Sequence, residues 1–366
     1  MELKHIIKQF QTEGRLVDFF PYGTGHINDT YKVVSSEKSS SNYLLQKINH
    51  NVFKDVPGLM ENIRRVTTHI RKKLLEIPGS NPDRETLSLI DTIDGKTFYL
   101  DDTGNYYRMY LFIDDHNTYD IVETTHQAYE AGRMFGKFQN FLSDLPGEPL
   151  NETIKDFHNI EFRLNELFSA LAADEEKRAN NVRNEIKFIE TRMDEMKILL
   201  NLSGKGEIPT RVTHNDTKFN NVLLDKNDNG LCVIDLDTVM PGLVHYDYGD
   251  SIRTATNTGA EDEVNLDKVE MDIKLFEGYT RGYLKEMVSL TNTELKYLPL
   301  AAKLLPYIIG IRFLTDYLKG DHYFKIKRKE HNLQRAKTQF KLLSSMERQY
   351  EKMIDIVSSI SRDYVK

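Results

Sequence analysis

Residues 211–242 read RVTHNDTKFNNVLLDKNDNGLCVIDLDTVMPG, and the spacing of polar residues within this stretch is the most informative feature of the chain. Three short apolar runs (RVT, VLLD and LCVID) predict strands, and the polar residues between them predict tight turns. Asp216 and Lys218 form Asp-x-Lys in the first turn. Asn221 lies five residues after Asp216, and Asp235 ends the third strand.

These side chains suit the transfer of a phosphoryl group from a nucleotide to a hydroxyl. A carboxylate in a loop, here Asp216, can orient the hydroxyl and accept its proton. Asn221 and Asp235 can hold Mg²⁺ on the nucleotide phosphates, because Mg²⁺ prefers oxygen ligands. Lys218 can neutralise charge on the moving phosphoryl group, whereas His214 is better suited to bracing the loop. Asn and Asp are also common turn residues, so a purely structural turn is the alternative interpretation.

Outward from this stretch, the chain divides into a strand-rich N-terminal third and a mainly helical remainder, which predicts an α+β protein of two lobes. Apolar residues at spacings of three and four predict a helix over 56–76, among short predicted strands. We expect an N-lobe at 1–113, a hinge at 114–118 and a helical C-lobe at 119–366 that contains the strand-rich island 210–240. Strands are predicted near 16–22, 29–34, 42–48, 87–91, 96–100 and 105–113, and C-terminal helices at 119–142, 155–171, 174–200, 247–256, 268–288, 293–318 and 329–364.

Composition excludes several classes of protein. Of the 366 residues, 39% are hydrophobic and 29% are charged, which is typical of a soluble globular protein. The net charge of -7 argues against a nucleic-acid partner or an anionic membrane surface. Cys232 is the one cysteine, so no disulfide framework is expected. We expect no membrane-spanning segment. The N-terminal residues do not read as a secretory signal, so a cytoplasmic location is expected.

The stretch HNDTKFNN…VIDLD resembles the catalytic and metal-binding segments of the protein-kinase-like fold in its small-molecule branch, which holds aminoglycoside phosphotransferases and choline kinases. The segments PYGTGHINDTY, RVTHNDTKFNNVLLD, IDLDTVMPG, YGDSIR and IRFLTDYLKGDHYF further resemble bacterial N-acetylhexosamine 1-kinases, in the same order from about residue 16 to about residue 350. The resemblance implies a bilobal protein-kinase-like fold, ATP and Mg²⁺. It also implies transfer to the anomeric hydroxyl of N-acetylglucosamine or N-acetylgalactosamine, giving the α-1-phosphate, with Asp216 as the base.

The nucleotide side of the expected site begins at the hairpin PYGTGHINDTY. Gly23, Thr24 and Gly25 resemble the turn that covers the phosphates, where glycine lets backbone N–H groups approach oxygen. Gly-x-Gly alone more often marks a plain hairpin. The phosphate lysine of the fold is expected on the third strand, where either Lys47 or Gln46 takes its position; Lys47 is alternatively a solvated lysine. Glu61 is a candidate partner for that lysine, or a surface glutamate near a helix start.

The acceptor side is predicted partly by resemblance. His26, Arg312 and Tyr323 match sugar-contacting positions of the family, together with Asp216. Carboxylates at Asp247 and Asp250 can accept hydrogen bonds from sugar hydroxyls, although Asp250 or Ser251 is also suited to capping the nearby helix. Arg312 and Asp316 lie four residues apart in an apolar helix, so a plain helix ion pair is the alternative for Arg312.

Three other functions remain open from the sequence alone. The first is a kinase for another small alcohol, such as a different hexose, an aminoglycoside or choline. The second is a catalytically inactive nucleotide-binding protein, which the presence of Asp216, Asn221 and Asp235 disfavours. The third is a metal-dependent hydrolase, which lacks support because the sequence has no His-rich metal cluster.

Overall fold

The structure, a computed structural model, describes residues 2–14, 16–23, 27–36 and 41–364, which fold into two compact units. The sheet unit contains residues 1–118, 141–155 and 221–241. The helical unit contains residues 119–140, 156–220 and 242–366. An antiparallel sheet in one unit and helices in the other confirm the predicted α+β class.

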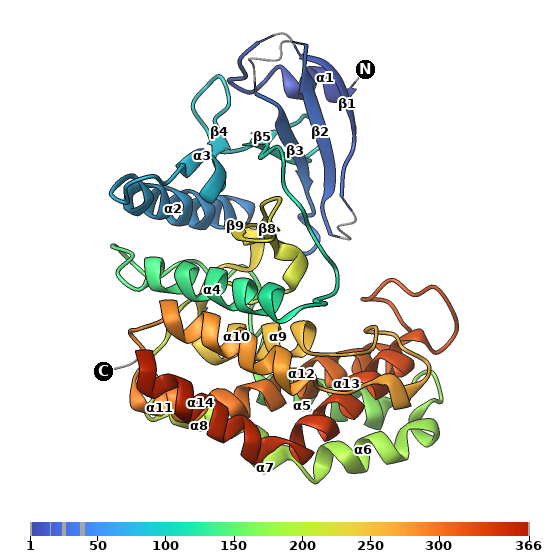
Figure 1. The fold of residues 1–366 in the computed structure, drawn as a ribbon. Helices are drawn as coiled ribbons and strands as arrows, with labels where there is room; N and C mark the ends of the chain where they lie inside the picture. The colour runs from blue at the N-terminus through green and yellow to red at the C-terminus, as the bar shows by residue number, and fades with distance from the viewer. Residues whose placement is uncertain (1, 15, 24–26, 37–40, 365–366) are drawn as a thin grey trace. The chain divides into compact units, whose positions relative to one another are not determined.

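The sheet unit is built around antiparallel strands in the order β1-β2-β3-β6-β4, with β5 also paired to β6 (Figure 1). Each strand is short, and turns near residues 94–95 and 103–104 precede and follow β5. The strands are β1 (Leu16–Pro21), β2 (Asp29–Ser35), β3 (Tyr43–Ile48), β4 (Leu89–Ile90), β5 (Tyr99–Leu100) and β6 (Tyr106–Leu111).

The two faces of this sheet have different environments because successive side chains point to opposite sides. Leu45 and Met109, which are partners across β3 and β6, belong to an apolar cluster with Ile6 and Phe10 of the N-terminal segment that contains α1 (Glu2–Ile7). The next residues along the strands face the other side. There Thr30, Gln46 and Arg108 stand opposite one another in register across β2, β3 and β6. The polar face therefore carries the side chains that matter for the site.

Helix α2 (Val56–Leu75) and the hairpin of β8 (Val222–Leu224) and β9 (Gly230–Val233) complete the sheet unit. Asp55 caps α2 by accepting a hydrogen bond from the backbone N–H of Gly58, as expected at a helix start. The hairpin packs on α3 (Pro82–Glu85) and carries the fully buried Cys232. The compact units thus group residues 221–241 with the sheet, whereas the predicted lobe boundaries, with their hinge at 114–118, placed that segment with the helices.

The helical unit contains the remaining helices. Its helices are α4 (Thr125–Leu142), α5 (Ile160–Ala173), α6 (Arg183–Glu190), α7 (Met193–Met196), α8 (Ile198–Gly204), α9 (Val244–Ala255), α10 (Ile273–Glu286), α11 (Asn292–Lys296), α12 (Leu298–Leu318), α13 (His331–Arg348) and α14 (Tyr350–Tyr364). The single helix predicted over 174–200 is wrong: the segment forms α6, α7, α8 and the 3₁₀ turn Ala179–Val182, which contains two asparagines of low helix propensity. Likewise the helix predicted over 329–364 ends at Arg348 and restarts at Tyr350.

Helix α12 is the core of the helical unit and packs against α13, α9 and α5. All of its residues are buried except Arg312, which is half-buried. By length and composition this helix is apolar enough to cross a membrane, which the sequence analysis did not expect. Neighbouring helices cover it, however, and 94% of the apolar window is buried, as in the core helix of a folded protein.

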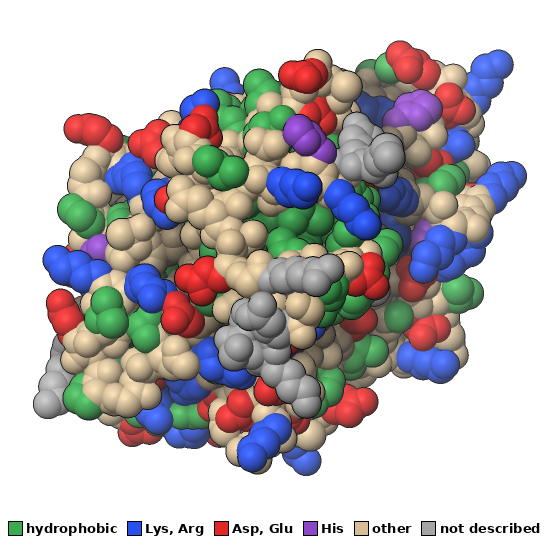
Figure 2. All heavy atoms as spheres, turned by 90° about the horizontal axis from the view of Figure 1, so that it is seen from above, with side chains coloured by type: hydrophobic (Ala, Val, Ile, Leu, Met, Phe, Trp, Pro, Cys, Tyr) green, Lys and Arg blue, Asp and Glu red, His purple; other side chains and the backbone are tan. Residues whose placement is uncertain are grey.

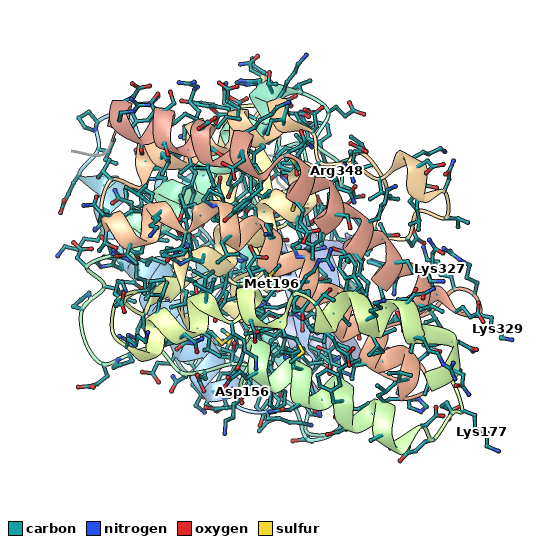
Figure 3. The ribbon with its side chains drawn as sticks, turned by 90° about the horizontal axis from the view of Figure 1, so that it is seen from below. Asp156, Lys177, Met196, Lys327, Lys329 and Arg348 are labelled. Carbon is teal, nitrogen blue, oxygen red and sulfur yellow. The ribbon has the colours of Figure 1, made fainter. Side chains whose placement is uncertain are left out.

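Charged side chains of both signs cover the surface. On the face that Figure 2 displays, Lys and Arg side chains are interspersed with Asp and Glu side chains. The basic run 325–329 lies in the loop between α12 and α13, where Lys327 and Lys329 project outward from the helices (Figure 3). All five residues of this run are exposed.

Candidate functional site

The loop that follows β7 (Arg211–Thr213) in the helical unit presents the predicted base. Asn215 has a positive φ of 65°, which turns the chain sharply before Asp216. The ammonium Nζ of Lys218 lies 2.8 Å from Oδ1 and 3.2 Å from Oδ2 of Asp216. The Asp216 side chain is 23% exposed and that of Lys218 is 44% exposed, so both remain accessible to a ligand.

The electrostatic surroundings keep Asp216 ionised. Burial is the largest single influence and raises the pKa of this carboxyl, but the charge and hydrogen bond of Lys218, together with the nearby His214 and Arg253, outweigh it, so the net shift is downward. The same pair raises the pKa of Lys218, because the Asp216 carboxylate favours the ammonium form. Near neutral pH the structure therefore holds a carboxylate and an ammonium in contact.

His214 braces this loop, as the sequence analysis suggested. It is fully buried, and its ring meets the rings of Phe135 and Phe138 edge-on at centroid distances of 5.6 Å. Its Nδ1 accepts a hydrogen bond from the backbone N–H of Asp216 at 3.3 Å. The imidazole thus fixes the backbone that carries the base.

Asp247 has a different environment from the one expected for a sugar-binding carboxylate. It lies in the first turn of α9 and is fully buried. Its carboxylate accepts the backbone N–H of His214 at 2.7 Å and of Asn215 at 2.6 Å, and the side-chain amide of Gln139 at 2.7 Å. Burial raises the pKa of Asp247 to about 6, although these donors oppose the shift. Since its oxygens are already engaged, we propose that Asp247 positions the loop instead of contacting the acceptor.

Asp250 also holds the loop from α9. Its Oδ2 accepts the backbone N–H of Thr217 at 3.0 Å, and its Oδ1 accepts Nε of Arg253 at 2.9 Å. Asp250 and Ser251 were suggested as helix caps, and this prediction is wrong because α9 begins earlier, at Val244. An apolar residue, Leu243, occupies the N-cap position, so the start of the helix could not be recognised from cap chemistry.

The two predicted metal ligands are brought together within the sheet unit by the β8–β9 hairpin. Val222 pairs with Val233, and the backbone N–H of Ile234 donates to the carbonyl of Asn221 at 2.9 Å. The backbone of Asn221 is therefore hydrogen-bonded to that of Ile234, the residue before Asp235. Asp235 is exposed and has a positive φ of 59°, a conformation that is unusual for a residue other than glycine.

The side chains of Asn221 and Asp235 suit a magnesium ion. One carboxylate and one amide oxygen are hard ligands, which suits an ion that completes its shell with water and phosphate oxygens. No cluster of three or more His, Cys, Asp or Glu residues suited to a metal occurs among the described residues. The pair supplies two oxygen ligands, so a Mg²⁺ ion held here would take its other ligands from water and phosphate oxygens.

The predicted nucleotide residues are only partly within the described structure. Thr24, Gly25 and His26 lie outside the described residues. Gly23 has a φ of 79°, which a side chain would strain, as expected at a tight hairpin turn. Lys47 pairs with Tyr107 on the face of the apolar cluster, whereas Gln46 faces Thr30 and Arg108 on the polar face. This register favours Gln46 for the position of the third-strand lysine; the predicted phosphate contact of Lys47 stays a prediction.

The sequence analysis missed a buried ion pair in the sheet unit. The Arg108 guanidinium contacts the Asp237 carboxylate, and the side chains of these residues are 1% and 4% exposed. Glu61, the acid suggested as partner of a third-strand lysine, is exposed and instead accepts a hydrogen bond from Asn151 at 3.3 Å. The available signal was a lone arginine within the otherwise uncharged run YYRMYLF at 106–112.

The predicted acceptor residue Arg312 lies among aromatic rings of the helical unit. Its guanidinium carbon is 4.8 Å from the ring centroid of Phe157, 5.9 Å from that of Tyr323 and 5.6 Å from that of Phe324. Burial lowers the pKa of Arg312, while the Tyr323 side chain and the more distant Asp216 carboxylate oppose that shift. Arg312 and Tyr323, two of the predicted acceptor residues, therefore lie side by side.

The alternative i, i+4 ion pair with Asp316 does not form within the described part of the chain. The Asp316 carboxylate instead accepts the backbone N–H groups of His322, Tyr323 and Phe324 at 2.8–3.0 Å. It also accepts the side-chain amide of Asn332 at 2.9 Å. Asp316 therefore shapes the loop that brings Tyr323 and Phe324 to Arg312.

Comparison with known proteins identifies the family of this chain. Residues 19–284 match the model of APH, the phosphotransferase enzyme family, and the chain belongs to this family. It is a small-molecule phosphotransferase with the protein-kinase-like fold of that family.

Three solved structures show the same fold at low sequence identity. The microcompartment-associated aminopropanol kinase is 15% identical, with a TM-score of 0.64 over 96% of this chain and 98% of that one. An aminoglycoside phosphotransferase from Alicyclobacillus acidocaldarius is 11% identical, with a TM-score of 0.61 over 95% and 96%. An amicoumacin kinase in complex with AMP-PNP and Ca²⁺ is 11% identical, with a TM-score of 0.56 over 96% and 92%.

Proposed function

We propose that the protein transfers the γ-phosphoryl group of ATP to the anomeric hydroxyl of an N-acetylhexosamine, N-acetylglucosamine or N-acetylgalactosamine, giving the α-1-phosphate. Family membership supports the reaction class. The acceptor rests on the resemblance of the segments around residues 21–31 and 311–324 to sugar 1-kinases. The observation that carries the proposal is that Arg312 lies among three aromatic rings in the same unit as Asp216.

In this proposal Asp216 acts on the acceptor hydroxyl. Its lowered pKa keeps the carboxylate ionised, so it accepts a hydrogen bond from the hydroxyl and directs the oxygen toward the γ-phosphorus. As the new P–O bond forms and the bond to the β-phosphate oxygen breaks, the hydroxyl proton passes to Asp216 and ADP leaves. No covalent intermediate with the protein is required.

Lys218 would neutralise negative charge on the phosphates directly, and Asn221 and Asp235 would do so through Mg²⁺. Lys218 remains an ammonium because Asp216 raises its pKa, and its exposed side chain can shift toward a phosphoryl oxygen. Asn221 and Asp235 would hold Mg²⁺, which neutralises phosphate charge when bound. The positive φ of Asp235 aims its side chain differently from that of a regular strand residue.

The charge near Arg312 favours a neutral, oxygen-rich acceptor over a cationic one. Arg163 also lowers the pKa of Arg312, so two guanidinium groups lie in this region. Arg163 is itself paired with Glu166 at 2.7 Å, so Arg312 is the cation that the ammonium group of an amino alcohol or aminoglycoside would meet, and it would repel that group. A hydroxyl or acetamido oxygen can accept hydrogen bonds from a guanidinium, and sugar faces pack well on aromatic rings. A kinase for a different hexose is therefore the strongest alternative.

The reaction can be tested by coupling ADP release to a panel of sugars, aminoglycosides and choline, followed by ³¹P NMR of the product. We expect turnover with N-acetylglucosamine or N-acetylgalactosamine and a phosphorus signal coupled to the anomeric proton. Phosphorylation of the 6-hydroxyl, or equal turnover of sugars without the acetamido group, would reject the proposed acceptor.

The base is tested by Asp216→Asn, for which we expect at least about 100-fold lower turnover with an unchanged circular dichroism spectrum. Asp267→Asn is the control, because that side chain is 94% exposed and takes no part in the site. Unchanged turnover of Asp216→Asn would remove Asp216 as the base.

A further inference from the structure

The sheet unit contains one feature that the proposed mechanism does not use: Arg108 is among its largest fully buried side chains. A buried guanidinium is unfavourable unless charged and polar partners surround it. Arg108 projects from β6 to the polar face of the sheet, where Nε donates to Oε1 of Gln46 at 2.9 Å. Gln46 is in turn fixed by its own hydrogen bond to Oγ1 of Thr30 at 3.1 Å.

The charged partner of Arg108 comes from the predicted metal-binding turn. Asp237 lies in the 3₁₀ turn Leu236–Thr238, two residues after Asp235. One carboxylate oxygen of Asp237 contacts the guanidinium, and the other accepts Nδ2 of Asn28 at 2.7 Å. One buried carboxylate therefore joins the metal-binding turn to β6 and to the residues that lead into β2.

Asn28 extends this network toward the end of the glycine hairpin. Its Oδ1 accepts the backbone N–H of Asn49, just after β3, at 2.9 Å. Each member thus has a defined partner, and the network spans β2, β3, β6 and the turn after β9. Just after that turn, the carbonyl of Val239 accepts a hydrogen bond from the side-chain amide of Asn62 in α2 at 3.0 Å.

We propose that Arg108 and Asp237 are positioning residues that fix the Asp235 turn for metal-bound nucleotide, in place of a third-strand lysine paired with an α2 glutamate. The inference rests on the proposed function, because it concerns how that nucleotide is held. Gln46 occupies the strand position of the lysine, and the buried cation is supplied by the neighbouring strand. The pair also neutralises the Asp237 charge, so Asp235 is not faced by a second unpaired carboxylate two residues away.

Asp237 lies two residues after Asp235, and its carboxylate is held by both Arg108 and Asn28. Loss of Arg108 or Asp237 should therefore displace the Asp235 turn and weaken metal binding without altering the acceptor side of the site.

The test compares Asp237→Asn, Arg108→Lys and Asn28→Ala with the wild-type protein. ADP affinity is measured by calorimetry with and without Mg²⁺, and turnover is measured across Mg²⁺ concentrations. We expect the half-saturating Mg²⁺ concentration to rise about 10-fold or more in the first two variants. The Mg²⁺-dependent gain in ADP affinity should fall to a similar extent, while the KM for the acceptor stays within about two-fold. Asn28→Ala keeps the ion pair, so we expect a smaller rise in the half-saturating Mg²⁺ concentration and a smaller loss of the Mg²⁺-dependent gain in ADP affinity.

Glu347→Gln provides a matched control, because it breaks a bidentate ion pair with Arg192 in the helical unit at 2.8 and 2.9 Å. It should lower the melting temperature without changing the Mg²⁺ requirement. If Asp237→Asn and Arg108→Lys also change only the melting temperature, the positioning role is wrong. If Asp237→Asn does not fold, Asn28→Ala decides the outcome, and an unchanged Mg²⁺ requirement in that variant overturns the proposal.

The outcomes separate this inference from the proposed function. Nucleotide binding by the wild type without turnover of any N-acetylhexosamine would reject the acceptor but leave the calorimetric test of Arg108 and Asp237 in place. Turnover of the sugar with a normal Mg²⁺ requirement in Asp237→Asn would reject the positioning role alone. Failure of the wild type to bind ADP with Mg²⁺ would overturn both.

Discussion

Asp247 shows how a single buried carboxylate can act on a site without facing solvent. It accepts two backbone N–H groups of the loop that carries Asp216, and hydrogen bonds to a charged group are stronger than those between neutral groups. The raised pKa of Asp247 reflects its burial, which these donors only partly offset. Its expected effect is therefore on the geometry of catalysis and not on acceptor affinity.

We predict that Asp247→Asn lowers kcat at least about 10-fold while the KM for the acceptor changes by less than about two-fold. The amide group would place an N–H against the backbone N–H of His214 or Asn215, so the loop loses one of its anchors. Steady-state kinetics over a range of acceptor concentrations measure both parameters. A raised KM with unchanged kcat would instead restore the sugar-binding role first expected for Asp247.

Residue-level prediction from the sequence worked best where the signal was local. Asn221 and Asp235 flank two adjacent strands, so their proximity followed from the hairpin pattern alone. Arg108 and Asp237 are 129 positions apart, and no local pattern joins them. Asp247 could be recognised as a nearby carboxylate, but its burial depends on where α9 begins, and an apolar N-cap position concealed that start.

At the scale of elements, the packing of α9 on α12 holds the loop in place. Gly249 lies between Asp247 and Asp250, and a Cβ built there would be 2.3 Å from the carbonyl oxygen of Ala301 and 2.8 Å from Cδ2 of Leu305. The two helices therefore approach more closely than a larger side chain allows. Because backbone cannot move aside as a flexible side chain can, this contact is sensitive to substitution.

We predict that Gly249→Ala destabilises the protein by about 1–3 kcal/mol and lowers kcat, because α9 must shift away from α12. Gly204→Ala is the matched control: Gly204 is the last residue of α8, and no atom lies within 4 Å of its built Cβ. That variant should be neutral or slightly stabilised. Urea unfolding and turnover assays check both variants; equal stability of the two alanine variants would contradict the proposed close packing.

Elements were predictable in proportion to the regularity of their sequence. The helix predicted over 56–76 matches α2, because its apolar stripe and the Asp55 cap are both local signals. The strands of the sheet also match closely. The charged segment 174–200 is rich in helix-forming residues, and its two asparagines, at 180 and 181, were too weak a signal to reveal that it breaks into short helices.

At the scale of the whole molecule, buried titratable groups such as His158, His245 and Asp247 couple stability to pH. His158 and His245 are buried, and their ring Nε2–H groups donate to backbone carbonyls. Burial lowers the pKa of each histidine to about 4, so acid protonates them more readily in the unfolded chain. Asp247 has the opposite effect, since its raised pKa of about 6 means that the folded protein binds the proton more tightly.

We predict that the free energy of unfolding rises as the pH increases from 4 to 6.5, because two histidines outweigh one aspartate. One pKa unit corresponds to about 1.4 kcal/mol, so the net gain over this range is on the order of 3 kcal/mol. His245→Gln should flatten the dependence and Asp247→Asn should steepen it. Urea titrations at several pH values measure this, with the exposed His322→Gln as control. A wild-type free energy that falls over this range would contradict the assignment.

Because Cys232 in β9 is buried and is the protein's sole thiol, the rate at which it reacts measures how often this part of the structure opens. Burial raises the pKa of this thiol, so it becomes ionised and reacts with alkylating reagents only when the hairpin that bears Asn221 and Asp235 opens to solvent. The rate of Cys232 alkylation in the wild-type protein would therefore measure the local opening of that hairpin. Dyes could also be attached to newly introduced surface cysteines under folded conditions while the native one stays silent.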